Sequence, residues 1–392
     1  MNPNRRHVLV AASALALVAG TAQAQGNRVS DTEIVIGTHI DLSGPAAPAM
    51  PMLRNAMQLR IDEANAAGGI HGRKIRLIVE DNGSAPQQAV RAVQKLIKSD
   101  NVFAILNPFG SGPNAATVKM ATDAGVMVFA PWGASSIIQR VGGNSPLLFT
   151  TVQNYDTTTA SALSWAVKNW KTAKVGVIYQ EGPFGDLVRA GVAQALKEGG
   201  FAVSAEAAYK VGDIDFSSQV AKMKAANVDL ILAGTVTRET LGVMSEVKKL
   251  NWTNVRVLTT IPGRSSVVAR LGKESVEGLY GIGGWRLHDP DTTEPAAAKF
   301  LAAYKQKFNA DADENAANAY SYTSWFLAGV QAAGRNLTAE SLSNALKATR
   351  HQDFTTYAAQ SFVNNHVSPE PASIDQIRGG KWVQVVAPSA VK

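Results

Sequence analysis

The chain has 392 residues, with 38 Lys and Arg against 31 Asp and Glu, which gives a formal net charge of +7 at pH 7. It contains no cysteine, which excludes disulfides, thiolate metal sites, a cysteine nucleophile and a lipid-attachment cysteine. The positive charge is spread along the chain without a block of five like charges, so it is better explained by a solvated surface than by nucleic-acid binding. The length suggests two domains of ordinary size.

Residues 1–24 have the layout of a secretory signal peptide. Arg5 and Arg6 precede an apolar run at 8–19, and residues 22–24 (AQA) form a small-x-small cleavage site. The apolar run is shorter than the roughly 20 residues that a membrane span needs. We therefore expect this segment to be removed, which lowers the net charge to +5, and the mature protein to be soluble in the periplasm. Arg5 and Arg6 are compatible with both the general and the twin-arginine export route. Two arginines are also an ordinary basic start of a signal peptide, so we favour the general route.

From residue 33 the predicted elements alternate between strands and helices. In chain order they are a strand at 33–37, a loop at 38–49, a helix with an apolar stripe at residues 53, 57, 61 and 64 that stops at Gly68-Gly69, a strand at 74–80, and a helix marked by apolar residues 90, 93 and 97. This alternation predicts a parallel sheet with right-handed crossovers.

Residues 102–136 hold two apolar strand segments, and each runs directly into a turn of Gly, Pro, Ser and Asn. In an open parallel sheet such turns lie at the carboxyl ends of the strands, where ligands bind. The unsatisfied N–H groups at the start of a following helix favour an anion. The pattern therefore predicts a small-ligand site, suited to a carboxylate.

The same alternation is repeated in the second half of the chain. The predicted elements are strands at 174–179, 229–233 and 255–260, helices at 185–197 and 237–250, a glycine-rich crossing segment at 278–284, helices at about 294–308, 314–333 and 339–349, and a last strand at 382–386. We predict an α/β fold with two lobes, lobe 1 from residues 28–150 and 281–360 and lobe 2 from residues 151–280 and 361–392. A cleft between such lobes can hold a small molecule and close by hinge motion.

Five stretches together carry a more specific signal: IGTHIDLSGP at 36–45, IDEANAAGGIHGRKIRLIVED at 61–81, FGSGPNAA at 109–116, VFAPWGASS at 128–136 and LGKESVEGLYG at 271–281. Over nearly all of the chain after residue 24, it resembles the leucine/isoleucine/valine-binding type (type I) of periplasmic solute-binding protein, the extracytoplasmic receptor of ABC importers. The resemblance implies a Venus-flytrap fold, in which each lobe is a parallel sheet flanked by helices and the ligand lies between the lobes.

The resemblance also implies where the ligand binds. In members that bind amino acids, the carboxylate is held by two turns, which fall here on Gly110 and Ser111 and on Trp132, Gly133, Ala134 and Ser135. The ammonium is held by a threonine of the second turn and by an acidic residue of the other lobe, which fall on Ala134 and Ile261. Neither side chain can accept a hydrogen bond, and an unpaired buried ammonium costs several kcal/mol. We therefore expect a carboxylate without an α-amine, aromatic or branched.

Six further residues are candidate ligand contacts, each with a structural alternative. Aromatic faces could sandwich a planar or apolar ligand, whereas the same rings could simply pack at the hinge. Arg264 could pair with a second acidic group, and Thr235 could offer a hydroxyl or cap a helix. His39 could touch the ligand or form a structural pair with Asp41. The candidates are Tyr155, Phe184, Thr235, Pro262, Arg264 and His39. Ser111 could likewise be a helix cap, and Trp132 a core residue under a loop.

The leading interpretation is a monomeric binding protein that delivers a small carboxylate to an inner-membrane ABC permease. The alternatives are a receptor for branched-chain or other amino acids of the same family, and a sensor subunit. An exported hydrolase would need a Ser-His-acid set, and Ser111 has no evident histidine partner in the sequence. The histidines are scattered and no dinucleotide fingerprint is present, so we expect no enzyme activity, no metal and no cofactor.

Overall fold

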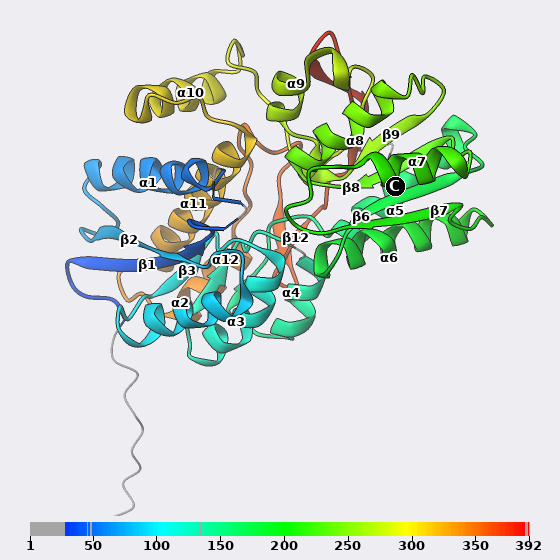
Figure 1. Ribbon diagram of the computed structural model, residues 1–392. Coiled ribbons are helices and arrows are strands. Elements are labelled where there is room, and N and C mark those ends of the chain that lie inside the picture. The colour runs from blue at the N-terminus through cyan, green and yellow to red at the C-terminus, as the bar shows by residue number, and fades with distance from the viewer. Residues whose placement is uncertain (1–27, 45, 48, 134, 389–390, 392) are drawn as a thin grey trace, which may run out of the picture.

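Two large sheets, each covered by helices, form two lobes that lie side by side (Figure 1), and the other two strands of the described residues form a separate hairpin. The structure is a computed structural model that describes residues 28–44, 46–47, 49–133, 135–388 and 391. The expected signal peptide at 1–24 lies outside the described residues.

The first sheet has five parallel strands in the order β2-β1-β3-β4-β5. Its strands are β1 (Glu33–Ile40), β2 (Lys74–Asp81), β3 (Ala104–Leu106), β4 (Met127–Phe129) and β5 (Leu148–Phe149). A helix follows each of the first four: α1 (Met50–Ala66), α2 (Pro86–Lys98), α3 (Ser111–Asp123) and α4 (Ser135–Gly142). The strand–helix alternation is as predicted through β4, and α4 is an additional helix. Strand β1 continues to Ile40, beyond the expected loop start at residue 38, because it pairs with β2 along its whole length.

The two faces of this sheet are covered by different helices. Ile105 and Val128 pack into a cluster with side chains of α2 and α3. Leu106 and Phe129 point to the opposite face, where the ring of Phe129 lies 5.5 Å from that of Phe326 in α11 (Glu314–Ala333). Burial on both faces explains why these strands are continuous apolar runs in the sequence.

The second sheet has seven strands in the order β14-β13-β10-β9-β8-β6-β7. They are β6 (Val175–Gln180), β7 (Ala205–Tyr209), β8 (Leu230–Gly234), β9 (Arg256–Thr259), β10 (Tyr280–Gly283), β13 (Ser373–Arg378) and β14 (Lys381–Val386). All pair in parallel except β13 and β14, which are antiparallel to their neighbours. Helices α5 (Tyr155–Trp170) and α6 (Pro183–Glu198) cover one face. Helices α7 (Ser217–Ala225), α8 (Thr237–Lys249) and α9 (Ser266–Gly272) cover the other, and two short 3₁₀ turns, η1 (Ile261–Gly263) and η2 (Lys273–Val276), flank α9.

The chain passes between the lobes three times. It leaves the first sheet after β5, returns after β10 through α10 (Pro295–Phe308), α11 and α12 (Ala339–Ala348), and enters the second sheet again at β13. Before that last passage, β11 (Ser361–Val363) and β12 (His366–Ser368) form a hairpin. The ring of Phe362 lies 4.9 Å from that of Phe149, so this hairpin packs on the first lobe.

One prediction of the crossing segments is wrong. The glycine-rich stretch at 278–284 contains β10, which pairs with β9 and β13 inside the second sheet, so the crossing begins only after it. The pairing of β10 within the second sheet favours a lobe boundary after residue 283 rather than at 281. The packing of the hairpin on the first lobe favours a boundary after residue 368 rather than at 361.

Candidate ligand-binding site

The two turns singled out in the sequence lie side by side at the carboxyl ends of β3 and β4. The N–H of Gly110 donates to the carbonyl of Trp132 (2.9 Å), and the N–H of Trp132 donates to the carbonyl of Pro108 (2.8 Å). The buried amide of Asn114 donates to the same two carbonyls, at 2.9 Å to Pro108 and 2.8 Å to Trp132. The spacing of the two turns is therefore fixed by backbone and side-chain bonds together.

Two glycines allow this close approach. Gly110, which precedes α3, has φ +103° and Gly133 has φ +141°, and L-residues rarely adopt either angle. A Cβ on Gly133 would lie 2.7 Å from the backbone nitrogen of Ser111, the first residue of α3. Of the other predicted contacts here, Ala134 lies outside the described residues. Ser135 opens α4, and its side chain is not described.

Aromatic side chains from both lobes meet near these turns. Trp132 is buried, with its ring centroid 6.4 Å from that of Trp285 and 5.9 Å from that of Tyr322. At the starts of α5 and α6, Tyr155 and Phe184 make an edge-to-face pair at 5.1 Å. All five rings belong to one buried cluster that spans both lobes. Burial raises the pKa of Tyr155 and of Tyr322, so both phenols are neutral at ordinary pH. Trp285 and Tyr322 were not predicted, because only the fold brings them beside Trp132.

His39 lies under the turns as a satisfied buried side chain. Its Nδ1 faces the amide of Asn82 (3.0 Å) and its Nε2 faces the hydroxyl of Thr117 (3.4 Å). Burial lowers the pKa of His39 from 6.5 to about 3, so the ring is neutral. Its expected pair with Asp41 does not form, because Asp41 accepts from Gly44, Ala46 and Ser84 instead. With both ring nitrogens engaged, we leave His39 out of the proposed site.

This burial predicts an acid-dependent loss of stability. The unfolded chain takes up a proton at His39 near pH 6.5 and the folded chain only near pH 3, so stability present above pH 6.5 is lost as the pH falls between these values. In His39→Gln, the drop in unfolding free energy between pH 7 and about pH 4.5 should be smaller than in the wild type by about 2–3 kcal/mol. Urea unfolding at both pH values measures this, and equal drops in the two proteins would contradict it.

Arg264 is fully buried and does not face solvent as a free cation. Its Nε donates to Asp375 (2.6 Å), its Nη2 contacts both Asp375 and the hydroxyl of Tyr357, and its Nη1 donates to the carbonyl of Trp285 (2.8 Å). Burial alone would lower the pKa of Arg264, but the interactions with Tyr357 and Asp375 outweigh it and raise the pKa. The guanidinium thus joins the segments where the chain crosses between the lobes, and we leave it out of the proposed ligand contacts.

The remaining predicted contacts lie on the second lobe. Thr235 is fully buried, with its hydroxyl 2.7 Å from that of Thr240 and 3.3 Å from that of Thr259, so it belongs to a threonine cluster. Pro262 is half-buried in the 3₁₀ turn η1, and Ile261 before it is buried. The position at which the resemblance places an acidic side chain is therefore occupied by a buried apolar one.

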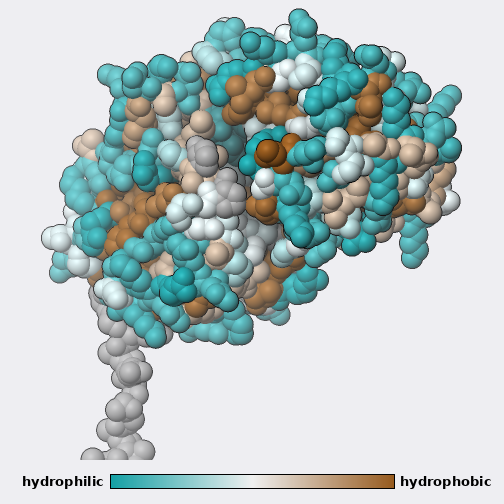
Figure 2. Space-filling model, in the orientation of Figure 1, coloured by the Kyte–Doolittle hydropathy of each residue, from teal (hydrophilic) through white to brown (hydrophobic). Residues whose placement is uncertain are grey.

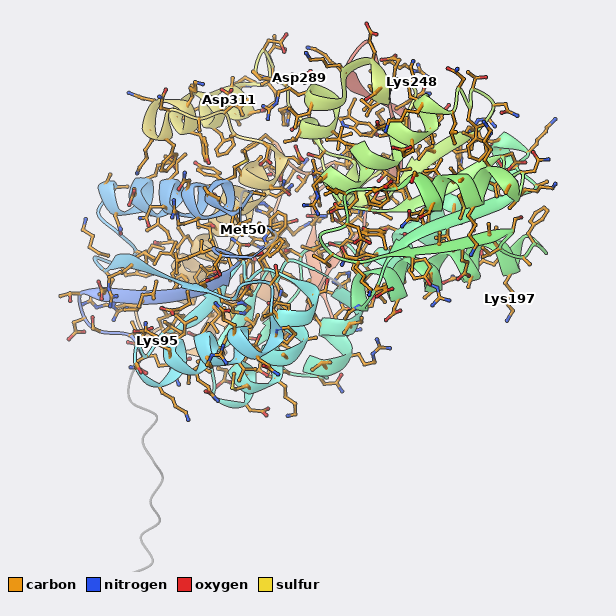
Figure 3. All side chains as sticks on the ribbon, viewed as in Figure 1. Met50, Lys95, Lys197, Lys248, Asp289 and Asp311 are labelled. Carbon is orange, nitrogen blue, oxygen red and sulfur yellow. The ribbon has the colours of Figure 1, made fainter. Side chains whose placement is uncertain are left out.

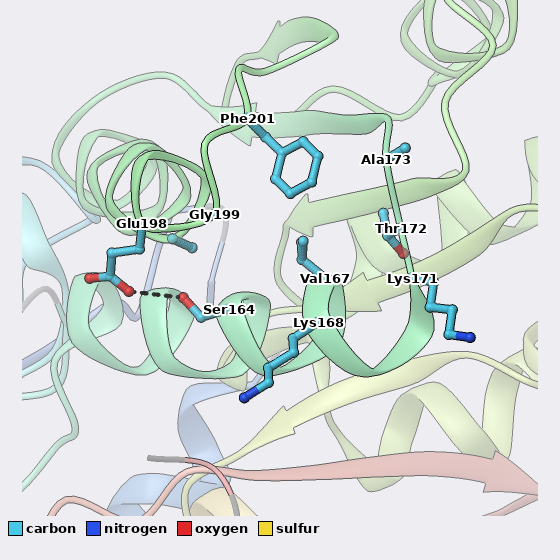
Figure 4. A pocket seen from close by; sticks show the side chains of 10 residues that line it. Ser164, Val167, Lys168, Lys171, Thr172, Ala173, Glu198, Gly199 and Phe201 are labelled. Carbon is cyan, nitrogen blue, oxygen red and sulfur yellow. Dashed lines mark hydrogen bonds between the residues drawn. The ribbon is translucent and has the colours of Figure 1, made fainter.

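The surface is hollowed where the two lobes meet (Figure 2). Charged side chains such as Lys95, Lys197, Lys248, Asp289 and Asp311 point outward at the periphery (Figure 3). A separate open pocket of about 530 Å³ lies between the carboxyl-terminal ends of α5 and α6, with Val167, Ala195 and Phe201 in its wall and Lys168 at its rim (Figure 4). Because Tyr155 and Phe184 lie at the opposite ends of the same helices, this pocket is not part of the candidate site.

Two α/β lobes, with strand-end turns and aromatic rings gathered between them, define a two-lobed ligand-binding protein. The model of the periplasmic binding protein family matches residues 33–381, and the chain belongs to this family. The resemblance to the leucine/isoleucine/valine-binding type is confirmed. The Leu/Ile/Val-binding protein BraC3 of Rhizobium johnstonii is 26% identical over 324 residues, which cover 81% of this chain and 84% of BraC3.

Solved structures show the same fold. A solute-binding protein of an ABC transporter from R. palustris, in complex with benzoate, matches with a TM-score of 0.80 at 19% identity, over 91% of this chain and 96% of that one. The branched-chain amino acid binding protein LivJ of Streptococcus pneumoniae, in complex with isoleucine, matches with a TM-score of 0.78 at 22% identity, over 91% and 99%. At these identities the likeness supports the two-lobed fold, as predicted.

Proposed function

We propose that this chain is the periplasmic receptor of an ABC importer and binds a small carboxylate without an α-amine, aromatic or branched, between its lobes. The observation that carries the proposal is Ile261, a buried apolar residue at the position where the resemblance places the acidic partner of an ammonium. A carboxylate would sit at the paired turns of Gly110 and Gly133, where the amides that open α3 and α4 favour an anion. The rings of Trp132, Tyr155 and Phe184 would enclose its apolar body.

Ligand binding would act by a population shift. A ligand that bridges both lobes binds the closed form better and so moves the hinge equilibrium toward closure. The closed form would then dock on the permease as a monomer. Within the part of the chain that the structure describes, no helix is both long enough and apolar enough to cross a membrane. Export would depend on the signal peptide expected at residues 1–24.

Two alternative functions, an amino-acid receptor and a hydrolase, can be compared with specific observations. Among similar proteins, BraC3 carries a Leu/Ile/Val-binding name and LivJ was solved with isoleucine, so an amino-acid ligand is the second candidate. For a hydrolase, two hydroxyl–histidine–acid arrangements among the described residues come into question. The hydroxyl of Ser321 lies 2.9 Å from Nε2 of His351, but Asp353 approaches that same nitrogen at 3.4 Å, whereas a relay needs the acid on the other one. The hydroxyl of Thr150 lies 2.7 Å from Nδ1 of His366, whose Nε2 contacts Glu370. However, Thr150 is 1% exposed and Ser321 is fully buried. Because neither hydroxyl is open to a substrate, we propose a binding protein rather than an enzyme.

A thermal-shift screen tests the proposal. Protein unfolded and refolded to remove bound ligand is tested against L-amino acids and against amine-free carboxylates that include aromatic acids. We expect only the second panel to raise the melting temperature, since a ligand at about 100 times its Kd adds about 2.7 kcal/mol to the stability of the folded state. A clear shift with leucine or isoleucine, and none with the amine-free acids, would make the protein an amino-acid receptor.

A further inference from the structure

Several buried polar atoms in the crossing segments beside the candidate site lack a hydrogen-bond partner among the described residues, including oxygens of Thr151 and Asn154, and two of these atoms adjoin Ile261 or Trp132. One is Oε1 of Gln153, whose residue is 2% exposed and follows β5 in the first crossing between the lobes. The other is the indole Nε1 of Trp285, whose residue is 6% exposed and follows β10 in the second crossing. Buried polar groups in native proteins almost always have partners, so an unpaired acceptor and an unpaired donor in one interlobe region point to a ligand.

The acceptor lies on the second-lobe side of the region. A Cβ placed on Gly284 would be 2.7 Å from Oε1 of Gln153 and 3.3 Å from Cδ1 of Ile261. Gln153 and Ile261 therefore flank the same glycine. The unpaired acceptor is next to the residue that occupies the position of the family's acidic side chain.

The donor belongs to a ring that packs against the first lobe. The ring of Trp285 lies 6.4 Å from that of Trp132, whose backbone belongs to the turn proposed to hold the carboxylate. The unpaired donor is thus on a ring in contact with the turn residue Trp132, and the unpaired acceptor is beside Ile261. A ligand that fits this arrangement has its anionic end at the turns and a hydrogen-bond donor at the other side.

The acceptor is an uncharged amide oxygen, and this decides which donor it suits. It can accept one bond from an ammonium but cannot neutralise its charge, and the apolar side chain of Ile261 beside it cannot do so either. A hydroxyl is neutral and needs only one acceptor for its proton. On the basis of the proposed function, we infer that the ligand is a hydroxy acid, a 2-hydroxycarboxylate with an aromatic or branched body. Gln153 is the residue that selects its hydroxyl.

Matched probes that differ in one group test this inference. Mandelate, phenylacetate and phenylglycine share an aromatic body and carry OH, H and ammonium at the same carbon; 2-hydroxyisocaproate, 4-methylpentanoate and leucine form the branched set. In calorimetric titrations, we expect the hydroxy acid of at least one set to bind about 10–100-fold more tightly than its plain acid, and the amino acid to bind most weakly.

Substitutions at Gln153 separate its role from general packing. Gln153→Met keeps the length without the acceptor and should reduce the preference for the hydroxy acid to about threefold or less, with plain-acid affinity unchanged. Gln153→Glu supplies a carboxylate and should raise amino-acid affinity about 10-fold or more. Gly284→Ala, whose Cβ would displace Oε1, should abolish the hydroxyl preference while Gln153 remains. Gln194→Met, on the exposed face of α6, is the control and should change none of the affinities.

Each result supports the inference or overturns it. If plain and hydroxy acids bind equally, or if Gln153→Met keeps the hydroxyl preference, the inference fails while the proposed function stands. If the amino acids bind and no amine-free acid does, or if none of the six probes binds the folded protein, both fail.

Discussion

Replacing Asp375 with Asn should lower the free energy of unfolding by about 3–5 kcal/mol, because it leaves the guanidinium of Arg264 buried without its counter-charge. Both side chains are almost fully inaccessible, and Asp375 accepts from Nε of Arg264 at 2.6 Å. The amide that replaces the carboxylate has nearly the same size, so the loss reports charge rather than a cavity. Urea unfolding at neutral pH measures it.

Two further variants make this prediction decisive. At the exposed pair of Lys119 and Asp123 on α3, Asp123→Asn should change stability by less than about 1 kcal/mol. The double variant Arg264→Met with Asp375→Leu removes both charges and should recover most of the stability lost in Asp375→Asn. A single variant as stable as the wild type would show that Arg264 is compensated by Tyr357 and the carbonyl of Trp285 alone.

Close packing against Arg264 explains why the prediction of a crossing segment at 278–284 is wrong. Four glycines at 278–284 predict a bend, whereas the structure uses two of them for close packing within β10. A Cβ on Gly281 would lie 2.7 Å from Cβ of Arg264, and one on Gly283 would lie 2.0 Å from Oγ of Ser373. Glycine in a strand can mark such a close approach, but the sequence does not show what approaches it.

Elements with long apolar periodicity were predictable, and elements with weak local signals were not. In the first lobe, elements β1 to β4 follow the predicted order, whereas α4 and β5 were not predicted; helices α6, α8 and α10–α12 match the prediction within a few residues. Helix α5 was not predicted, because its first two turns contain three threonines at 157–159, which disfavour helix. The hydroxyls of Thr157 and Thr158 bond back to the carbonyl of Asn154, at 3.1 and 2.8 Å, a local pattern that propensity does not reveal.

For the candidate site, residues next to recognisable turns could be proposed from sequence, and residues defined by tertiary contact could not. The turns at Gly110 and Gly133 can be recognised from the sequence, because each places glycine in a turn that directly follows a predicted strand. Gln153 and Trp285 lie in crossing segments that contain no recognisable motif. They become candidates only because each has a buried polar atom without a hydrogen-bond partner in the folded structure. Arg264 illustrates the opposite error, since a charged residue beside a binding loop suggests a ligand contact until its buried partner is known.

The close contact between the two turns leads to the last prediction, that Gly133→Ala abolishes high-affinity binding. The added Cβ would lie 2.7 Å from the nitrogen and 2.8 Å from Cα of Ser111, and both are backbone atoms that no rotamer change can move away. The turns must therefore separate, and hydrogen bonds to a carboxylate weaken steeply with distance and angle. We expect affinity for the best amine-free acid to fall about 100-fold or more, equivalent to about 3 kcal/mol.

Gly212→Ala is the matched control for this substitution. Gly212 also has a φ that L-residues rarely adopt, +101°, but a Cβ there would meet nothing within 4 Å. It should lower stability by about 1–3 kcal/mol through backbone strain and leave ligand affinity unchanged. Calorimetric titration of both variants, with unfolding curves to confirm that each is folded, separates strain from displacement of the turns. If Gly133→Ala binds within about threefold of the wild type, the amides that open α3 and α4 do not hold the carboxylate.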